Sequence, residues 1–146
     1  VALRMKQHCE NAEKVVNFLK KHKEVTKVIY STEHEKKIAD RAKQYLKGGN
    51  GPMVGIELKG GIEAGKKFIE SLKMFYHVAN IGDARSLAIH PASTTHSQLN
   101  EKELAASGVT QSYVRLCIGI EHIDDIIDDL DQALNKSSKG SLKAVS

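Results

Sequence analysis

Apolar residues recur at helical spacing in some stretches of the chain and at strand spacing in others. At the start they stand three, four and seven positions apart, which places them on one stripe of a helix. These residues are Met5, Ala12, Val15, Val16 and Leu19. Residues 25–30 form a short run rich in β-branched side chains, which is typical of a strand. The first part of the chain therefore predicts a helix followed by a strand.

The same alternation continues through the middle of the chain. Residues 38–46 carry apolar side chains on one face, which predicts a second helix that Gly48-Gly49 ends. Residues 53–58 predict a second strand, and residues 62–75 predict a third helix. In residues 78–99 regular periodicity disappears. A connection of this length is usually functional or disordered, and its mixed composition favours a functional loop.

The last third of the chain begins with a capping-box arrangement at residues 100–103, and Gly108 closes the short helix that follows. Residues 113–120 alternate as a strand does, so Arg115 lies on the face opposite the apolar one. The apolar face consists of Val114, Leu116, Ile118 and Ile120.

A final helix is predicted after this strand, with its aspartates on the outside. Its inner stripe is Ile123, Ile126, Ile127, Leu130 and Leu134. Strands that alternate with helices predict an α/β layer structure, in which helices cover a small mixed or antiparallel sheet.

Length and composition limit the classes of protein to consider. A chain of 146 residues is the size of one domain and can bury a single core. There is no run of eighteen or more apolar residues, which argues against a membrane span. Cys9 and Cys117 are the only cysteines, so no disulfide framework is implied. We expect a soluble cytoplasmic domain.

The charge of the chain suggests nucleic-acid binding, but its distribution argues against it. The net charge is +4 and the pI is near 9.0. Acidic and basic residues are interleaved in the N-terminal third, and residues 121–131 are acidic. A phosphate-binding surface needs basic side chains on one face, and base stacking needs aromatic residues, which make up only 5% of this chain. We expect no nucleic-acid partner.

Arg115 is the most informative single residue for chemistry. It lies in the middle of a strand that is at least half buried, and an unpaired buried guanidinium costs several kcal/mol. It therefore needs an anion, which is either a carboxylate of the protein or a carboxylate of a ligand. The residues alone leave both alternatives open.

Other candidate sites are weaker. His90 and His96 could bind a metal, but we favour histidines that satisfy the loop backbone. Gly60-Gly61 lacks the remainder of a phosphate-binding motif, so we interpret it as a turn. The acidic residues 124–131 lie on a predicted helix rather than in a calcium-binding loop. Cys9 and Cys117 are interpreted as small apolar packing residues.

Two long segments resemble a known family. Residues 79–96, with the run Asn80-Ile81-Gly82-Asp83, and residues 113–127, around Val114-Arg115-Leu116, are similar to signatures of the Cys/Met-metabolism family of pyridoxal-phosphate enzymes. Residues 1–12 resemble the long helix that leads into the family's C-terminal domain. The resemblance covers nearly the whole chain and is weakest at residues 31–50. It implies the C-terminal small domain of a fold type I pyridoxal-phosphate enzyme.

The resemblance also implies a substrate and site residues. Asn80, where related lyases have Ser, and the segment Leu58 to Gly65 make the chain most similar to the O-acetylhomoserine sulfhydrylases. These enzymes convert O-acetylhomoserine and sulfide to homocysteine and acetate, a step of methionine biosynthesis. The resemblance assigns Arg115 to the α-carboxylate of the amino-acid substrate, with Asn80 assisting and Thr95 near the pocket wall. Methionine γ-lyase and cystathionine γ-synthase types of the same family remain alternatives.

The chain departs from the family pattern in one large respect. The family's Schiff-base lysine and its phosphate-binding glycines lie upstream of any residue present here, so we expect no catalytic, cofactor-binding or metal-binding residue in this chain. The resemblance implies a missing N-terminal cofactor-binding domain, pyridoxal phosphate bound there, and a homotetrameric parent enzyme. We expect the isolated chain to be inactive; a stand-alone non-catalytic module is the other hypothesis.

The expected organisation has three parts. Residues 1–22 are interpreted as a remnant of the inter-domain helix, because no N-cap residue precedes the helical pattern. Residues 23–136 are the expected substrate-recognition domain, and residues 137–146 are an expected frayed tail rich in Ser and Lys.

Overall fold

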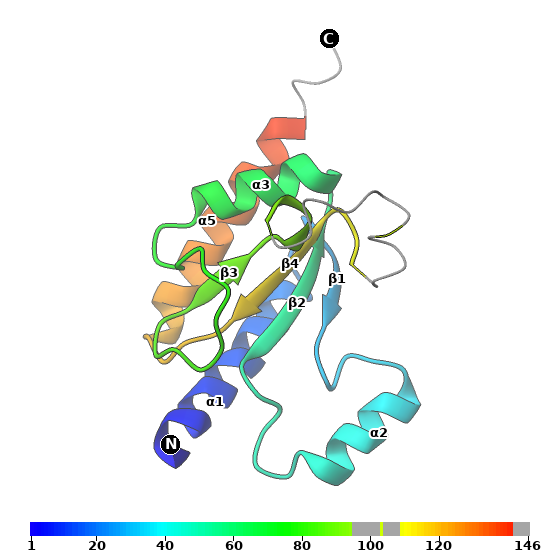
Figure 1. Cartoon of the computed structure of the whole chain (residues 1–146), viewed down its shortest axis with the longest axis vertical. Coiled ribbons are helices and arrows are strands. Elements are labelled where there is room, and N and C mark those ends of the chain that lie inside the picture. The colour runs from blue at the N-terminus through cyan, green and yellow to red at the C-terminus, as the bar shows by residue number, and fades with distance from the viewer. Residues whose placement is uncertain (95–102, 104–108, 142–146) are drawn as a thin grey trace.

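The computed structural model describes residues 1–94, 103 and 109–141, and it contains a small sheet with helices packed on one side (Figure 1). The helices are α1 (Ala2–Leu19), α2 (Lys36–Tyr45), α3 (Gly61–Ser71) and α5 (Ile123–Ser141), with a short 3-10 turn η1 (Pro91–Ser93). The strands are β1 (Val25–Ile29), β2 (Met53–Leu58), β3 (Leu87–Ile89) and β4 (Tyr113–Cys117). The predicted alternation of helices and strands is confirmed for these elements except β3 and η1, which lie in a segment predicted to be irregular.

The sheet is antiparallel throughout, in the order β1-β2-β4-β3. The last strand of the chain therefore lies inside the sheet, between two strands that precede it. In this register Arg115 of β4 stands opposite Gly55 of β2 on one side and opposite Ile89 of β3 on the other. This interior position holds β4, and with it the backbone of Arg115, between two paired strands.

The core fills the space between one face of the sheet and helices α1, α3 and α5. Strand residues on this face alternate with residues on the opposite face, as the pleat requires. The most deeply buried core side chains are Val54, Ile56, Val114 and Leu116 from the sheet and Leu19, Phe68, Ile126, Leu130 and Leu134 from the helices. Figure 1 shows α1 and α5 behind the sheet. Arg115 alternates with the core residues Val114 and Leu116, so it lies on the opposite face.

The structure corrects the expectation of an irregular segment at residues 78–99. Leu87 to Ile89 form strand β3, which pairs with β4, and all three residues are buried. A strand of three residues that is buried on both faces shows no alternation of polar and apolar positions, so the sequence pattern does not reveal it.

A second correction concerns the aspartates of the last helix, which we expected on the outside. Asp129 is only 6% exposed. Its carboxylate accepts hydrogen bonds from the backbone N–H groups of Lys73 (2.9 Å), Met74 (2.8 Å) and Phe75 (3.3 Å), just after α3 ends. Gln132 donates to the same carboxylate at 3.0 Å. Asp129 thus joins α5 to the turn that follows α3.

Helix α2 stands apart from the sheet (Figure 1). Of its residues only Ala42 is buried, whereas Ile38 and Tyr45 are 46% and 70% exposed. Helix α5 is described as far as Ser141, so the expected boundary at residue 137 falls within it. In the described part of the chain no helix is long and apolar enough to cross a membrane.

Candidate functional site

Arg115 lies on the sheet face opposite the helices, half buried beside a shallow pocket. The pocket has a volume of about 240 Å³, and β1, β2, β4 and the segment after β1 supply its walls. The residues that line it include Tyr30, Ser31, His34, Gly55, Tyr113 and Arg115. The pocket thus lies over the interior strands β2 and β4, and the edge strand β1 with the segment after it forms one side.

The guanidinium of Arg115 has no hydrogen bond and no ion pair with any residue that the structure describes. The acidic residue nearest to it in the register of β2, Glu57, is paired instead with Lys27 at 3.8 Å. Of the two alternatives open from the sequence, a protein carboxylate is therefore absent among the described residues. A half-buried guanidinium without a partner is suited to bind an external carboxylate.

Asn80 lies in the connection between α3 and β3, where its side chain is exposed. Its Oδ1 accepts a hydrogen bond from the backbone N–H of Ile81 at 2.8 Å. No hydrogen bond joins Asn80 to Arg115 in the described residues, and Asn80 does not line the pocket. Thr95, the third residue predicted for the site, lies outside the described residues, as does His96.

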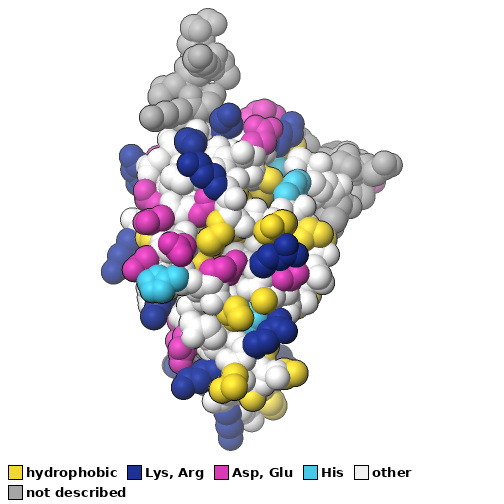
Figure 2. Space-filling view, turned by 90° about the vertical axis from the view of Figure 1, so that its left-hand side faces the viewer, with side chains coloured by type: hydrophobic (Ala, Val, Ile, Leu, Met, Phe, Trp, Pro, Cys, Tyr) yellow, Lys and Arg dark blue, Asp and Glu magenta, His cyan; other side chains and the backbone are white. Residues whose placement is uncertain are grey.

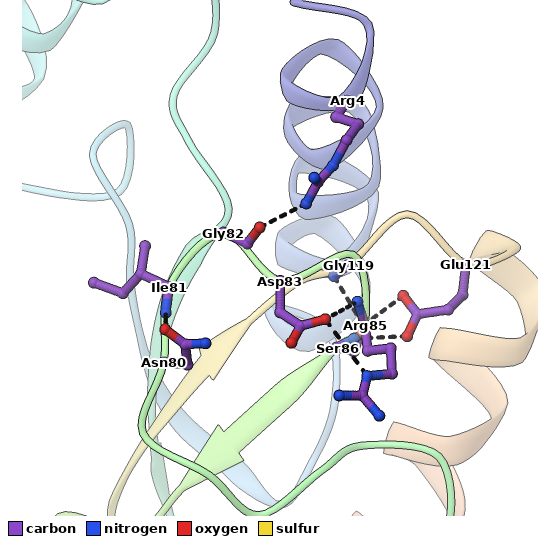
Figure 3. A network of polar contacts seen from close by, with 9 residues as sticks. All are labelled: Arg4, Asn80, Ile81, Gly82, Asp83, Arg85, Ser86, Gly119 and Glu121. Atoms are coloured by element: carbon purple, nitrogen blue, oxygen red, sulfur yellow. Dashed lines mark hydrogen bonds and ion pairs between the residues drawn. The ribbon is translucent and has the colours of Figure 1, made fainter. Parts of the chain in front are cut away.

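The segment that carries Asn80 is fixed to the sheet by Glu121 (Figure 3). The carboxylate of Glu121 accepts hydrogen bonds from the backbone N–H (2.6 Å) and the hydroxyl (3.0 Å) of Ser86. The Ser86 hydroxyl in turn accepts from the N–H of Gly119 at 2.9 Å. From helix α1, Arg4 donates to the carbonyl oxygen of Gly82 at 2.6 Å. The connection is therefore held at Gly82 and at Ser86, on the C-terminal side of Asn80.

Asp83 and Arg85 form a local ion pair in the same connection, at 3.5 Å. The backbone N–H and the guanidinium of Arg85 donate to the carboxylate and hold the pKa of Asp83 below its usual range. The same guanidinium lies 4.1 Å from the centre of the Tyr76 ring. Arg85 is thus partnered, in contrast to Arg115.

The contacts of His90 confirm the interpretation that this histidine hydrogen-bonds to the backbone of a loop. Its Nε2 lies 2.7 Å from the carbonyl oxygen of Gln111, and its Nδ1 lies 2.8 Å from the hydroxyl of Ser93. Burial lowers the pKa of His90, which favours the neutral ring, with Nε2–H as donor and Nδ1 as acceptor. Among the described residues no cluster of His, Cys, Asp or Glu is suited to a metal ion.

Two other interpretations from the sequence are confirmed. Gly60 and Gly61 both have positive φ, at 97° and 63°, and form the turn that leads into α3. Cys9 and Cys117 are free and buried. Figure 2 shows acidic and basic side chains interspersed on the face of the molecule that it presents.

The sequence patterns gave no functional role to Tyr113 and Gly55, which shape the pocket beside Arg115. Tyr113 shares the strand face of Arg115, which the alternation shows, but nothing in the pattern indicates where its hydroxyl lies. A glycine inside a strand is a known sign of a close approach. At Gly55 an added Cβ would lie 2.6 Å from the ring and 2.8 Å from the hydroxyl oxygen of Tyr113.

Comparison with known proteins gives a consistent result. A family model described as Cys/Met metabolism PLP-dependent enzyme matches residues 1–135. An O-acetyl-L-homoserine sulfhydrylase from Leptospira meyeri is 51% identical over 133 residues, which cover 90% of this chain and 30% of that protein. An L-methionine gamma-lyase from Fusobacterium nucleatum subsp. polymorphum is 43% identical over 134 residues, which cover 92% of this chain and 34% of the relative.

A solved structure of an O-acetylhomoserine (thiol)-lyase from Campylobacter jejuni has the same fold, with a TM-score of 0.83 and 41% identity. The match covers 92% of this chain and 32% of that one, which carries a pyridoxyl-lysine phosphate. The chain thus spans about a third of the length of the proteins it matches.

Proposed function

The chain belongs to the Cys/Met metabolism PLP-dependent enzymes, and we propose that it is the C-terminal substrate-recognition domain of an O-acetylhomoserine sulfhydrylase. The proposed reaction joins O-acetylhomoserine and sulfide to give homocysteine and acetate. The similarity to the sulfhydrylase from Leptospira meyeri and to the thiol-lyase structure supports this reaction. Because the chain spans about a third of these proteins, the reaction is proposed for an enzyme that contains it.

The proposal rests on the guanidinium of Arg115, which lies beside a pocket and has no partner among the described residues. In the proposed enzyme it binds the α-carboxylate of the amino-acid substrate through two parallel N–H···O hydrogen bonds. The interior strand β4 holds the backbone of Arg115 from both sides, so the side chain needs little reorganisation to bind. Binding the carboxylate fixes the orientation of the whole substrate.

The described residues do not fit the cofactor of the family. Each lysine whose burial is described is exposed, and none lines the pocket beside Arg115. A lysine that holds the cofactor covalently must lie in an enclosed site. We therefore assign the cofactor and the bond-making steps to an N-terminal domain of the proposed enzyme, and no step of the reaction to the residues of this chain.

Asn80 and Thr95 are assigned to the same substrate. We propose that Asn80 assists at the carboxylate, for which its backbone segment is held by Ser86 and Glu121. In the described structure its Oδ1 accepts a hydrogen bond from the backbone N–H of Ile81. The proposed role uses its Nδ2 group, which can donate to a carboxylate while that hydrogen bond is kept. Thr95 near the pocket wall stays a prediction.

A methionine γ-lyase is the second candidate, because such an enzyme is 43% identical over nearly the whole chain. The substrates of both reactions carry an α-carboxylate, so the presence of Arg115 does not distinguish a sulfhydrylase from a lyase. The discriminating measurement supplies the full-length enzyme either with O-acetylhomoserine and sulfide or with methionine alone. Homocysteine from the first pair supports the sulfhydrylase, whereas release of methanethiol from methionine supports the lyase.

The test of the Arg115 assignment compares three variants of the full-length enzyme. Arg115→Lys keeps the charge but loses the planar pair of donors, and Arg115→Ala loses both. Lys6→Ala, which removes an exposed cation on helix α1, is the control. We expect Arg115→Ala to lower kcat/KM for O-acetylhomoserine about 100-fold, since a charge-assisted bidentate contact contributes about 3 kcal/mol. A loss under about 3-fold, equal to the control, would contradict the assignment.

We also propose that the enzyme is a cytoplasmic homotetramer. Two free buried cysteines fit a reducing compartment, and the assembly rests on the family resemblance. Light scattering of the purified full-length enzyme measures its mass directly. A monomer would contradict the assembly.

A further inference from the structure

The hydroxyl of Tyr113 is a second polar group without a partner in the pocket that contains Arg115. Tyr113 lies two residues before Arg115 on β4, so both side chains point to the same face of the sheet. Among the described residues the Tyr113 hydroxyl makes no hydrogen bond. The hydroxyl of nearby Tyr30, by contrast, donates to the carbonyl oxygen of Gly51 at 2.9 Å.

Gly55 determines where this hydroxyl lies. The ring of Tyr113 crosses diagonally over Gly55, and the hydroxyl oxygen lies 2.8 Å from the place of a Cβ at that residue. Gly55 is also the residue directly opposite Arg115 in the register of β2 and β4. Directly opposed residues of an antiparallel pair have Cα atoms only about 5 Å apart. The hydroxyl therefore lies over the neighbour of Arg115, at the base of the same pocket.

The protonation state suits a donor. Burial raises the pKa of Tyr113, and the positive charge of Arg115 offsets only part of that increase. The phenol is thus protonated at neutral pH and has one O–H to donate. A pocket with a guanidinium and a phenol, neither of which has a partner in the part of the chain that the structure describes, offers donors and positive charge to one anion.

We propose that Tyr113 is a positioning and specificity-determining residue, whose hydroxyl donates a third hydrogen bond to the carboxylate held by Arg115. Gly55 makes this possible, because any side chain there would displace the Tyr113 ring. The ligand is an α-amino acid with a free carboxylate. This inference rests on the proposed function, since it places Tyr113 at the same substrate group as Arg115.

The experiment uses the full-length enzyme and compares Tyr113→Phe with a matched control, Tyr45→Phe. Tyr45 is 70% exposed on α2 and is not among the residues that line the pocket. KM and kcat are measured for O-acetylhomoserine and for sulfide. In addition, the Ki of an unreactive amino acid, L-norleucine, is compared with that of its carboxamide, which lacks the negative charge.

We expect Tyr113→Phe to raise KM for O-acetylhomoserine about 5-fold and to reduce the preference for norleucine over its carboxamide by a similar factor. KM for sulfide should not change, because sulfide has no carboxylate. A purely structural role would not change the carboxylate preference. Tyr45→Phe should equal the parent enzyme in every constant.

Gly55→Ala tests how the hydroxyl is placed. If Gly55 acts through Tyr113, adding Tyr113→Phe to Gly55→Ala should cost no further affinity, because the hydroxyl is already displaced. Equal effects of Tyr113→Phe in both backgrounds would overturn this part of the inference.

The Arg115→Lys variant separates this inference from the proposed function. If Arg115→Lys weakens binding of O-acetylhomoserine but Tyr113→Phe leaves KM and the carboxylate preference unchanged, the role of Tyr113 is refuted and that of Arg115 stands. If neither variant changes them, the pocket does not bind the carboxylate, and the proposed role of this domain is refuted as well.

Discussion

Asp129 should contribute more to stability than any other aspartate of helix α5. Its buried carboxylate accepts three backbone N–H groups, those of Lys73, Met74 and Phe75. Asp129→Ala removes all three acceptors at once. Lys73 is exposed, so its N–H can turn to water, whereas the N–H of Phe75 is buried and stays without a partner.

The expected magnitude follows from these contacts. A hydrogen bond to a charged group contributes about 1.5–3 kcal/mol, and a buried N–H left unpaired costs about 1–3 kcal/mol. With about two of the three donors affected, Asp129→Ala should lower the free energy of unfolding by about 3 kcal/mol. Asp129→Asn keeps one oxygen as an acceptor and should cost about 1–2 kcal/mol.

The assay is urea unfolding of the chain followed by far-UV circular dichroism, with amide hydrogen exchange at Phe75 as a local readout. The matched control is Asp128→Ala, because Asp128 is the exposed neighbour on the same helix and should change stability by no more than about 0.5 kcal/mol. If Asp129→Ala lowers the free energy of unfolding by less than about 1 kcal/mol, or by no more than Asp128→Ala does, the hydrogen bonds to the Asp129 carboxylate do not stabilise the fold and the reasoning is wrong.

Four further predictions follow from the structure. Gly119→Ala should destabilise the chain by about 2 kcal/mol in urea unfolding, because its Cβ would lie 2.5 Å from both the Ala84 oxygen and the Ser86 nitrogen; Gly48→Ala, which meets nothing within 4 Å, is the control. Stability should fall as the pH drops through about 6.5, because His90 is neutral when folded and the unfolded chain binds an extra proton; this slope, measured as unfolding against pH, should be smaller in His90→Gln. The 146-residue chain alone should give no detectable homocysteine from O-acetylhomoserine and sulfide, and turnover above background would contradict the assignment of the cofactor to another domain. It should also self-associate in light scattering, since Leu3, Tyr45 and Ile81 expose apolar surface.

Sequence patterns predicted the elements whose burial is one-sided. The apolar stripe of α1 and the alternation of β4 can be recognised in the sequence because each element has one solvent-exposed face and one buried face. Strand β3 was missed, since Leu87 to Ile89 are buried on both faces and exist as a strand only through pairing with β4. The burial of Asp129 was missed for a related reason, because its partners are the N–H groups of a turn more than fifty positions away.

The candidate site was predictable only in part. The strand pattern placed Arg115 on the face opposite the core. Because burying an unpaired charge is costly, an anion was expected to pair with its guanidinium. Whether that anion belongs to the protein depends on which side chains surround the pocket, which is a matter of tertiary packing. The absence of an acidic partner among the described residues, and the position of the Tyr113 hydroxyl over Gly55, appear only in the structure.

The strand order has a consequence for synthesis on the ribosome. Strands β1 and β2 are consecutive in the chain and can pair as soon as both have emerged. Until β4 is made, β3 has only a single bridge, from Leu87 to Tyr76, because β4 is the strand of the described sheet with which it pairs. Pairing of Met53 with Cys117 likewise joins distant parts of the chain, which slows folding. A nascent chain that stops before Tyr113 therefore exposes β2 along one edge and leaves β3 without its partner strand, and it should recruit chaperones until the strand with Arg115 inserts between them.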